Sequence, residues 1–352
     1  MQRRPAPEKR AAATFRCARF LERGAKRVVQ RATQGCMADH PALRAWSEIV
    51  KVELGQVNIE VLKNRRASLV CCLAGLGPGG SNVIAKRYPA PNGLTEYRIY
   101  REVLCRLPLT FPRHHGLVQE EGTGFCWAFF EDAAGERYSP QIQQHTMEAA
   151  ACLAVLHTSA CEVARDLALP ERGPRHYLDY LSSGRNRIRR SLASAVLSGE
   201  DQGVLAELAA QCDAVEAQWE LVERLCNSAP QTFVHADLYE ANIHVRTGPA
   251  GVTLVPFDWE SAGWGVPAID LALEGIDLAA YCSIVRRVWP GLDLRAVRAL
   301  SAAGRLFQLA ALIEWESRGL ESEWLRRRMK HMKYYQSAMS DAIRVISREA
   351  AQ

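Results

Sequence analysis

The first third of the chain alternates short apolar segments with polar turns, a pattern typical of β-strands. Four segments fit strands by this criterion: Val57–Leu62, Ser68–Ala74, Val83–Tyr88 and Phe125–Phe130. Between the last two, apolar side chains recur three or four positions apart from Leu94 to Leu107, which predicts a helix. We therefore expect a β-rich N-terminal lobe with one helix in residues 41–133.

From residue 134 onward the spacing becomes mostly helical. Four stretches fit helices: Gln141–Ser159, 200–226, 270–290 and 294–347. One hairpin interrupts them, with strands at Ile243–Val245 and Val252–Phe257 and a Thr-Gly-Pro turn. The pattern predicts an α+β protein of two lobes, in which residues 134–352 form the larger, mostly helical one.

The net charge of +5 changes the picture only at the N-terminus. Residues 1–36 contribute +8, from ten Arg or Lys and two Glu, so the rest of the chain carries −3. A nucleic-acid-binding face on the folded part is therefore not indicated. We expect residues 1–40 to be a basic, disordered extension, with Met37 as an alternative start; the other interpretation is a targeting or anionic-surface segment.

The composition indicates a globular protein with reduced thiols. Hydrophobic residues make up 48% of the chain, but no apolar run reaches the roughly 20 residues that a membrane span needs. The 11 cysteines are scattered and form no Cys-x-x-Cys pair, so we expect a cytoplasmic protein without disulfides or structural zinc. Cys71 and Cys72 should face opposite sides of a strand, and His114-His115 is interpreted as a turn pair.

A polar loop before the hairpin carries the candidate chemistry. His235, Asp237 and Asn242 have the spacing of a kinase catalytic loop, in which the Asp accepts the proton of the attacking hydroxyl and the Asn binds Mg²⁺. Asn242 precedes the first hairpin strand and Asp258 follows the second. Antiparallel pairing therefore returns Asp258 beside Asn242, as a second metal ligand.

Asp and Asn are also common turn and capping residues, and an isolated match to this spacing arises often by chance. The hairpin with an Asp at its far strand end is a much rarer context. Motif and context together favour the functional interpretation.

These segments resemble the aminoglycoside phosphotransferase and choline kinase-like family across about residues 55–345. The motifs that carry the resemblance are Leu156-His157, His235-Ala236-Asp237, Phe257-Asp258-Trp259-Glu260 and the segment Gly265–Ala272, with its Asp270-Leu271-Ala272. The resemblance implies a protein-kinase-like fold. It also implies transfer of phosphate from ATP, with Mg²⁺, to an alcohol group of a small molecule.

The resemblance has two departures. Ala236 stands where the family has Gly, a small change only if the backbone there is not left-handed. No Phe-Gly follows Asp258, which argues against an ordinary protein kinase. The family also implies supporting roles: His235 braces the loop through backbone bonds, and Asp270 caps a helix start and steadies the catalytic loop.

The nucleotide side depends on Lys86, in a strand similar to the one whose Lys holds the α- and β-phosphates in kinases. That Lys needs a Glu from the next helix. At 100° per residue, Glu96 falls on the apolar face of the 94–107 helix, whereas Glu102 falls opposite, between Arg98 and Arg106. We expect Glu96 to point toward Lys86; the alternative for Lys86 is a surface lysine on an edge strand.

The phosphate loop is less distinct. Gly75–Gly80 resembles one but directly precedes the Lys86 strand, whereas in kinases this loop joins the first two strands. The segment between the first two predicted strands is Lys63–Ser68, which has no Gly. The candidate contacts to phosphate in this segment are backbone amides, Ser68 Oγ and Arg65. The linker around Phe129–Ala133, including Glu131, would meet adenine through main-chain groups.

The acceptor remains open. The C-terminal region contains acidic, aromatic and basic residues: Glu314, Trp315, Glu316, Glu321, Glu323, Trp324 and Arg326-Arg327-Arg328. They could hold a cationic substrate or form solvated helix faces. Two other classes stay possible, a nucleotide-binding pseudokinase that regulates a partner and a protein kinase. The retained Lys86, Asp237, Asn242 and Asp258 argue against the first, and the missing Gly-rich loop and Ala-Pro-Glu segment against the second.

Overall fold

A computed structural model describes residues 40–50, 57–65, 67–249, 251–320 and 325–351. The N-terminal lobe is built on one antiparallel sheet in the order β1-β2-β3-β5-β4. Its strands are β1 (Ile59–Arg65), β2 (Ser68–Leu73), β3 (Val83–Pro89), β4 (His114–Glu120) and β5 (Phe125–Glu131). The four predicted strands are thus confirmed to within three residues at each end, and β4 is added to them.

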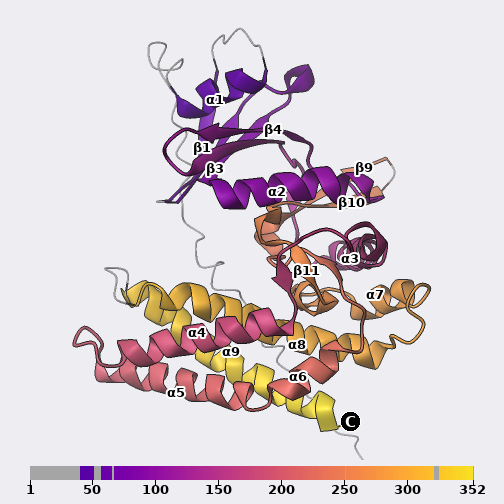
Figure 1. Cartoon of the computed structure of the whole chain (residues 1–352). Helices are drawn as coiled ribbons and strands as arrows, with labels where there is room; N and C mark the ends of the chain where they lie inside the picture. The colour runs from indigo at the N-terminus through magenta and orange to yellow at the C-terminus, as the bar shows by residue number, and fades with distance from the viewer. Residues whose placement is uncertain (1–39, 51–56, 66, 250, 321–324, 352) are drawn as a thin grey trace, which may run out of the picture.

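Helices cover both faces of this sheet (Figure 1). On one face α1 (Pro41–Ile49) buries Leu43 and Trp46 against an apolar cluster that includes Cys71. On the other lies α2 (Ala90–Glu102), which contacts both the sheet and the segment after the hairpin. Cys71 packs toward α1 and Cys72 does not, as expected for adjacent strand residues.

Several predictions for this lobe were wrong. Its described residues form two α-helices, because α1 lies before the first strand. The second begins at Ala90 instead of about Leu94, since proline is tolerated in the first turn of a helix. His114 and His115 do not form a turn but begin β4, where burial lowers the pKa of His114 to about 4.

The C-terminal lobe is mostly helical, with short strands near the lobe boundary (Figure 1). Its helices are α3 (Gln143–Val163), α4 (Pro174–Ser191), α5 (Gly199–Glu216), α6 (Trp219–Cys226), α7 (Leu278–Val285), α8 (Leu294–Ser317) and α9 (Leu325–Ala351). Its strands are β6 (Glu136–Arg137), β7 (Glu171–Arg172), β8 (Thr232–Val234), β9 (Ile243–Gly248), β10 (Gly251–Pro256) and β11 (Gly263–Gly265).

Here the predicted helices differ from the structure in number. The 200–226 stretch is two helices, α5 and α6. The 270–290 stretch is a 3-10 helix, η6 (Pro267–Ala272), followed by α7, and the 294–347 stretch divides into α8 and α9. Helix α4 was not predicted, because its mostly polar sequence buries only one narrow side.

In the core of this lobe α8 packs against η6, α4 and α9, α5 packs against α4 and α9, and α3 packs against α7. Gly304 on α8 allows this helix to approach η6, because a Cβ there would lie 1.7 Å from the carbonyl oxygen of Ala268. Among the described helices, α8 alone has the length and hydropathy of a membrane span, but 67% of its apolar window is buried inside the protein. The nine cysteines within the described residues are all free thiols.

Candidate active site

The candidate catalytic loop, residues 235–242, follows β8 directly, and Asp270 of η6 supports it. The carboxylate of Asp270 is fully buried and accepts hydrogen bonds from the backbone N–H of His235 at 2.8 Å and of Ala236 at 3.0 Å. His157 Nε2 lies 3.2 Å from the same carboxylate. The predicted capping of a helix by Asp270 is absent, since η6 has no side-chain cap, whereas the support of the loop is present.

Ala236 adopts a left-handed backbone, with φ of 63°. The replacement of the family's Gly is therefore not the small change expected for an ordinary backbone. A left-handed conformation costs a residue with a Cβ about 1–2 kcal/mol. The two hydrogen bonds from the loop to Asp270 help to hold it there.

Asn242 lies against Asp237, five residues earlier in the chain. Its Nδ2 donates to the carbonyl oxygen of Asp237 at 2.9 Å and lies 3.5 Å from Oδ2 of the Asp237 carboxylate. Its Oδ1 accepts no hydrogen bond from a described residue, so the amide oxygen faces away from these contacts.

The hairpin returns Asp258 to this loop as predicted. Strands β9 and β10 pair from Gly248 with Gly251 to Ile243 with Pro256, and the N–H of Phe257 donates to the carbonyl oxygen of Asn242 at 3.0 Å. His235 spans the two segments: its Nδ1 accepts from the N–H of Asp237 at 3.3 Å, and its Nε2 lies 3.0 Å from the carbonyl oxygen of Phe257. This pattern requires the proton on Nε2 and matches the predicted bracing role.

Lys86 is the centre of a cluster of charges between the lobes. Its Nζ lies 3.1 Å from Glu96, 2.5 Å from Asp258 and 3.3 Å from Glu260. Burial alone would lower the pKa of Lys86, but the three carboxylates raise it well above its usual value. Burial would likewise raise the pKa of Asp258, but the charge and hydrogen bond of Lys86 bring it down to about 2.

The choice of Glu96 over Glu102 agrees with the structure. Glu96 is buried on α2, where it also accepts hydrogen bonds from the hydroxyl of Tyr88 at 2.7 Å and the N–H of Trp259 at 2.8 Å. Glu102 is half-exposed and pairs with the exposed Arg98 at 3.3 Å. Glu96 thus links β3, α2 and the segment after the hairpin, and Lys86 is no edge-strand surface lysine.

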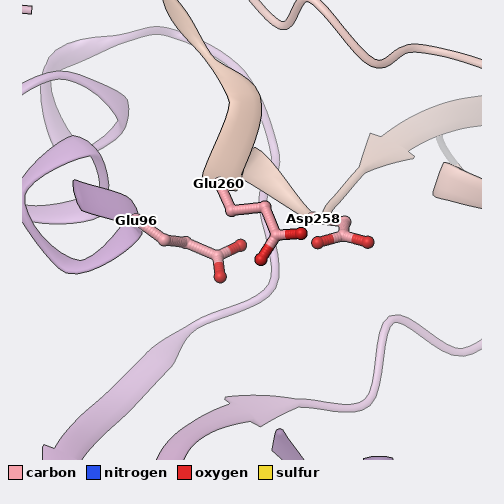
Figure 2. Close-up of side chains that lie close together, drawn as sticks. All are labelled: Glu96, Asp258 and Glu260. Atoms are coloured by element: carbon pink, nitrogen blue, oxygen red, sulfur yellow. The ribbon is translucent and has the colours of Figure 1, made fainter. Parts of the chain in front are cut away.

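Glu260 was missed as a site residue. Figure 2 shows its carboxylate beside those of Glu96 and Asp258, and their oxygens are close enough to share one metal ion. Burial raises the pKa of Glu260, as does the nearby charge of Asp258, against the opposing effect of Lys86. Its position in the sequence could have indicated this role, because Glu260 ends the Phe-Asp-Trp-Glu motif that carries the family resemblance.

The two candidate phosphate loops lie at opposite ends of β2. Ser68 begins β2 and pairs with Arg65 of β1; Arg66 lies outside the described residues. Gly75–Gly80 follows the other end, where Gly75 bonds Asn82 and Asn82 in turn bonds Asp132 of the linker. The Gly-rich segment is therefore near the linker and remote from the Ser68 turn.

The linker is tied to the hairpin by Arg246. Its guanidinium donates to the carbonyl oxygen of Ala133 at 2.6 Å and to the carboxylate of Glu131 at 2.9 Å. The N–H of Glu131 donates to the carbonyl oxygen of Arg113 at 2.8 Å. Both the side chain and the N–H of Glu131 are thus engaged, so a nucleotide contact by this residue would use its carbonyl oxygen.

On the acceptor side, the two described candidate carboxylates are already paired. Glu314 is buried on α8 and is bound by both terminal nitrogens of Arg187, and by Arg318 at 2.9 Å. Glu316 pairs with Arg328 at 2.8 Å and with His331 at 3.0 Å. The carboxylates of both residues are thus engaged by side chains of the protein itself.

Three other acceptor candidates, Glu321, Glu323 and Trp324, lie outside the described residues. Trp315 is 54% exposed, with the Arg318 guanidinium 5.8 Å from the centre of its ring. Arg326 and Arg327 are exposed on α9. The part of this region that the structure describes therefore presents no unpaired carboxylate for a cation.

Comparison with known proteins gives a family and a fold. The model of the phosphotransferase enzyme family, APH, matches residues 75–318, more than half of the chain. No curated protein sequence matches. Solved structures with the same two-lobed, kinase-like fold are similar over most of their length.

Three of these structures illustrate the likeness. A microcompartment-associated aminopropanol kinase has a TM-score of 0.59 at 14% identity, covering 89% of this chain and 99% of its own. A spectinomycin phosphotransferase, solved with ADP and spectinomycin, has a TM-score of 0.58 at 9% identity, covering 86% of this chain and 97% of its own. Choline kinase from Cryptosporidium parvum Iowa II has a TM-score of 0.56 at 11% identity, covering 84% of this chain and 91% of its own.

Proposed function

Since the chain belongs to the phosphotransferase enzyme family, we propose that it transfers the γ-phosphate of Mg·ATP to a hydroxyl group of a small molecule, with Asp237 as the base. The observation that carries this proposal is the approach of four segments that come from two distant regions of the sequence, two from each lobe. Lys86 of β3 bonds Glu96 of α2 and Asp258 after the hairpin, and the hairpin brings Asp258 next to the Asp237 loop.

The side chains near Asp258 fit a magnesium ion. Mg²⁺ prefers oxygen ligands and is commonly held by one or two carboxylates plus substrate phosphates. Asp258 supplies a carboxylate whose pKa of about 2 keeps it charged at neutral pH, and Asn242 has an amide oxygen without a protein partner among the described residues. When bound, the metal would neutralise charge on the phosphate oxygens.

In this mechanism each protein group has a separate task. The carboxylate of Asp237 accepts the proton of the acceptor hydroxyl as that oxygen attacks the γ-phosphorus, and the bond from the γ-phosphorus to the leaving ADP oxygen breaks. Lys86 exchanges its bond to Asp258 for phosphate oxygens and keeps Glu96, which holds its side chain in place. Asp270 and His235 position the loop without touching the reacting atoms.

The adenine base is proposed to contact main-chain groups of the linker near Glu131 and Ala133, with Ser68 near the phosphates. The acceptor is proposed to be a small hydroxyl compound that binds the C-terminal lobe. The related structures act on aminopropanol, spectinomycin and choline by their names, so amino alcohols and aminocyclitols belong among the compounds to test. The free thiols support a cytoplasmic location.

A substrate screen tests the proposal. Purified protein with Mg·ATP is incubated with amino alcohols, aminoglycosides, sugars and hydroxy amino acids, and ADP release is measured for each. We expect one chemical class to stimulate release well above the rate without acceptor. ATP binding without turnover on any class would instead indicate a pseudokinase, and phosphate transfer to a protein side chain would indicate a protein kinase.

A further inference from the structure

Lys63 of β1 faces the same side of the sheet as Lys86. In the strand register Lys63 pairs with Val70 of β2, and Val70 pairs with Lys86 of β3. Directly paired residues of neighbouring antiparallel strands project from the same face of a sheet. Two strand spacings separate the backbones of the two lysines, about 10 Å in all.

A bulge in β1 gives Lys63 this direction. Val61 pairs with Cys71 and packs toward α1, and in a regular strand Lys63, two residues later, would face α1 as well. The register shifts by one residue between Val61 and Lys63, which leaves Leu62 as the extra residue, 41% exposed. Bulges of this kind redirect side chains next to active sites.

The charge of Lys63 acts on the same cluster as that of Lys86. Burial lowers the pKa of Lys63, the negative charges of Asp258 and Glu260 raise it, and the positive charge of Lys86 lowers it. The Lys63 ammonium nevertheless makes no hydrogen bond or ion pair with any described residue. It is thus a cation at the rim of the acidic cluster that is not committed to a partner there.

The turn beside Lys63 also lacks the residue that usually lets backbone amides approach phosphate. The segment from Lys63 to Ser68 has no glycine. Backbone N–H groups without a Cβ beside them can surround phosphate oxygens closely, and a side-chain ammonium can supply positive charge where they cannot.

We propose that Lys63 binds the terminal phosphates of the nucleotide from the sheet side, opposite Asp258 and in addition to Lys86. This inference rests on the proposed function, because it assumes a nucleoside triphosphate in the cleft. It assigns to a β1 side chain the task that a Gly-rich loop performs with its backbone.

The test compares Lys63→Met with Lys63→Arg and with Lys330→Met, an exposed lysine on α9. Binding of ATP, ADP and AMP with Mg²⁺ is measured by calorimetry on the full chain. A charge-assisted hydrogen bond of ordinary strength corresponds to about a tenfold to hundredfold loss of affinity. We expect that loss for ATP in Lys63→Met, a smaller loss for ADP and none for AMP, with Lys63→Arg and Lys330→Met close to the parent protein.

The outcomes separate this inference from the proposed function. Unchanged ATP affinity in Lys63→Met, or equal losses for ATP and AMP, would overturn the role of Lys63 and leave the phosphotransferase proposal standing. Absence of ATP binding in the parent protein would overturn both. Lys63 belongs to neither apolar core cluster, so Lys63→Met should unfold at the same temperature as the parent, and loss of folding would not account for the result.

Discussion

The nucleotide side and the acceptor side of this protein use buried charge in opposite ways. Around Lys86, three carboxylates share one ammonium group, so the cluster keeps capacity for another cation. By contrast, Glu314 has two arginine partners, and Glu316 has an arginine and a histidine partner. Neighbouring carboxylates in this protein therefore indicate a cation-binding site only where their negative charges outnumber the positive charges of their partners.

The most damaging change on the catalytic side should be Asp237→Asn, which keeps the shape and removes the proton acceptor. Loss of a general base typically costs 10²–10⁴-fold in rate, and we expect kcat to fall by about that factor. Mg·ATP affinity, measured by calorimetry, should stay close to that of the parent. Unchanged turnover would remove Asp237 from the base role.

Asp258→Asn should act on binding instead of on proton transfer. It removes one negative charge from the position beside Lys86 and Asn242, so metal-dependent nucleotide affinity should fall by about tenfold or more. The measurement is ATP affinity at several magnesium concentrations. If Asp237→Asn and Asp258→Asn lose the same affinity, the division of tasks between the two residues is wrong.

The pair Glu96→Gln and Glu102→Gln compares a buried and a half-exposed position on one helix. Glu96 bonds Lys86, Tyr88 and Trp259, so its loss should weaken ATP binding by about tenfold. Glu102 contacts only the solvent-exposed Arg98 among the described residues, and its replacement should change affinity by less than about twofold. A larger effect for Glu102 would contradict the proposed role of Glu96.

On the acceptor side, Glu314→Gln should cost stability and not specificity. The change leaves Arg187 without its partner, and breaking a buried pair costs about 3–5 kcal/mol. Both arginines reach solvent, so we expect a smaller loss, about 1–3 kcal/mol, in denaturant unfolding. The matched control is Glu220→Gln, at an exposed pair. A change of preferred acceptor without loss of stability would show that Glu314 binds substrate.

The smallest effect is expected from a chain that begins at Met37. Residues 1–39 lie outside the described part of the chain, and their basic composition predicts no packing on the domain. This variant keeps α1, whose Leu43 and Trp46 are buried. Its melting temperature and ATP affinity should match those of the full chain; a lower melting temperature would show that the extension packs on the fold.

What could be predicted from sequence was mostly local. The hairpin that joins Asn242 to Asp258 spans few residues, and the orientation of Glu96 depends only on helix periodicity. The pairs Lys86 with Asp258 and Arg187 with Glu314 join residues 172 and 127 positions apart, which no spacing rule connects. The kinase-like motifs predicted that Lys86 and Asp258 belong to one site, whereas no motif in the sequence connects Arg187 with Glu314.

Burial and backbone conformation were the other limits. His114 and His115 look like turn residues by type, but they begin a strand that pairs with β5. The His114 ring packs on Phe130 and the His115 ring on Trp46. Ala236 has a side chain that normally avoids the left-handed region, so its φ could not be predicted from residue type. The same holds for the Lys63 bulge, which only the register with β2 shows.

The carboxylates around Lys86 have a thermodynamic consequence for the order in which ligands arrive. Counted formally, Glu96, Asp258 and Glu260 bring three negative charges against one positive charge, so a bare nucleotide anion meets a site of its own sign. A divalent cation is instead attracted by the excess negative charge of these carboxylates. Each ligand therefore raises the affinity for the other by the same factor, a reciprocal coupling that free-energy linkage requires.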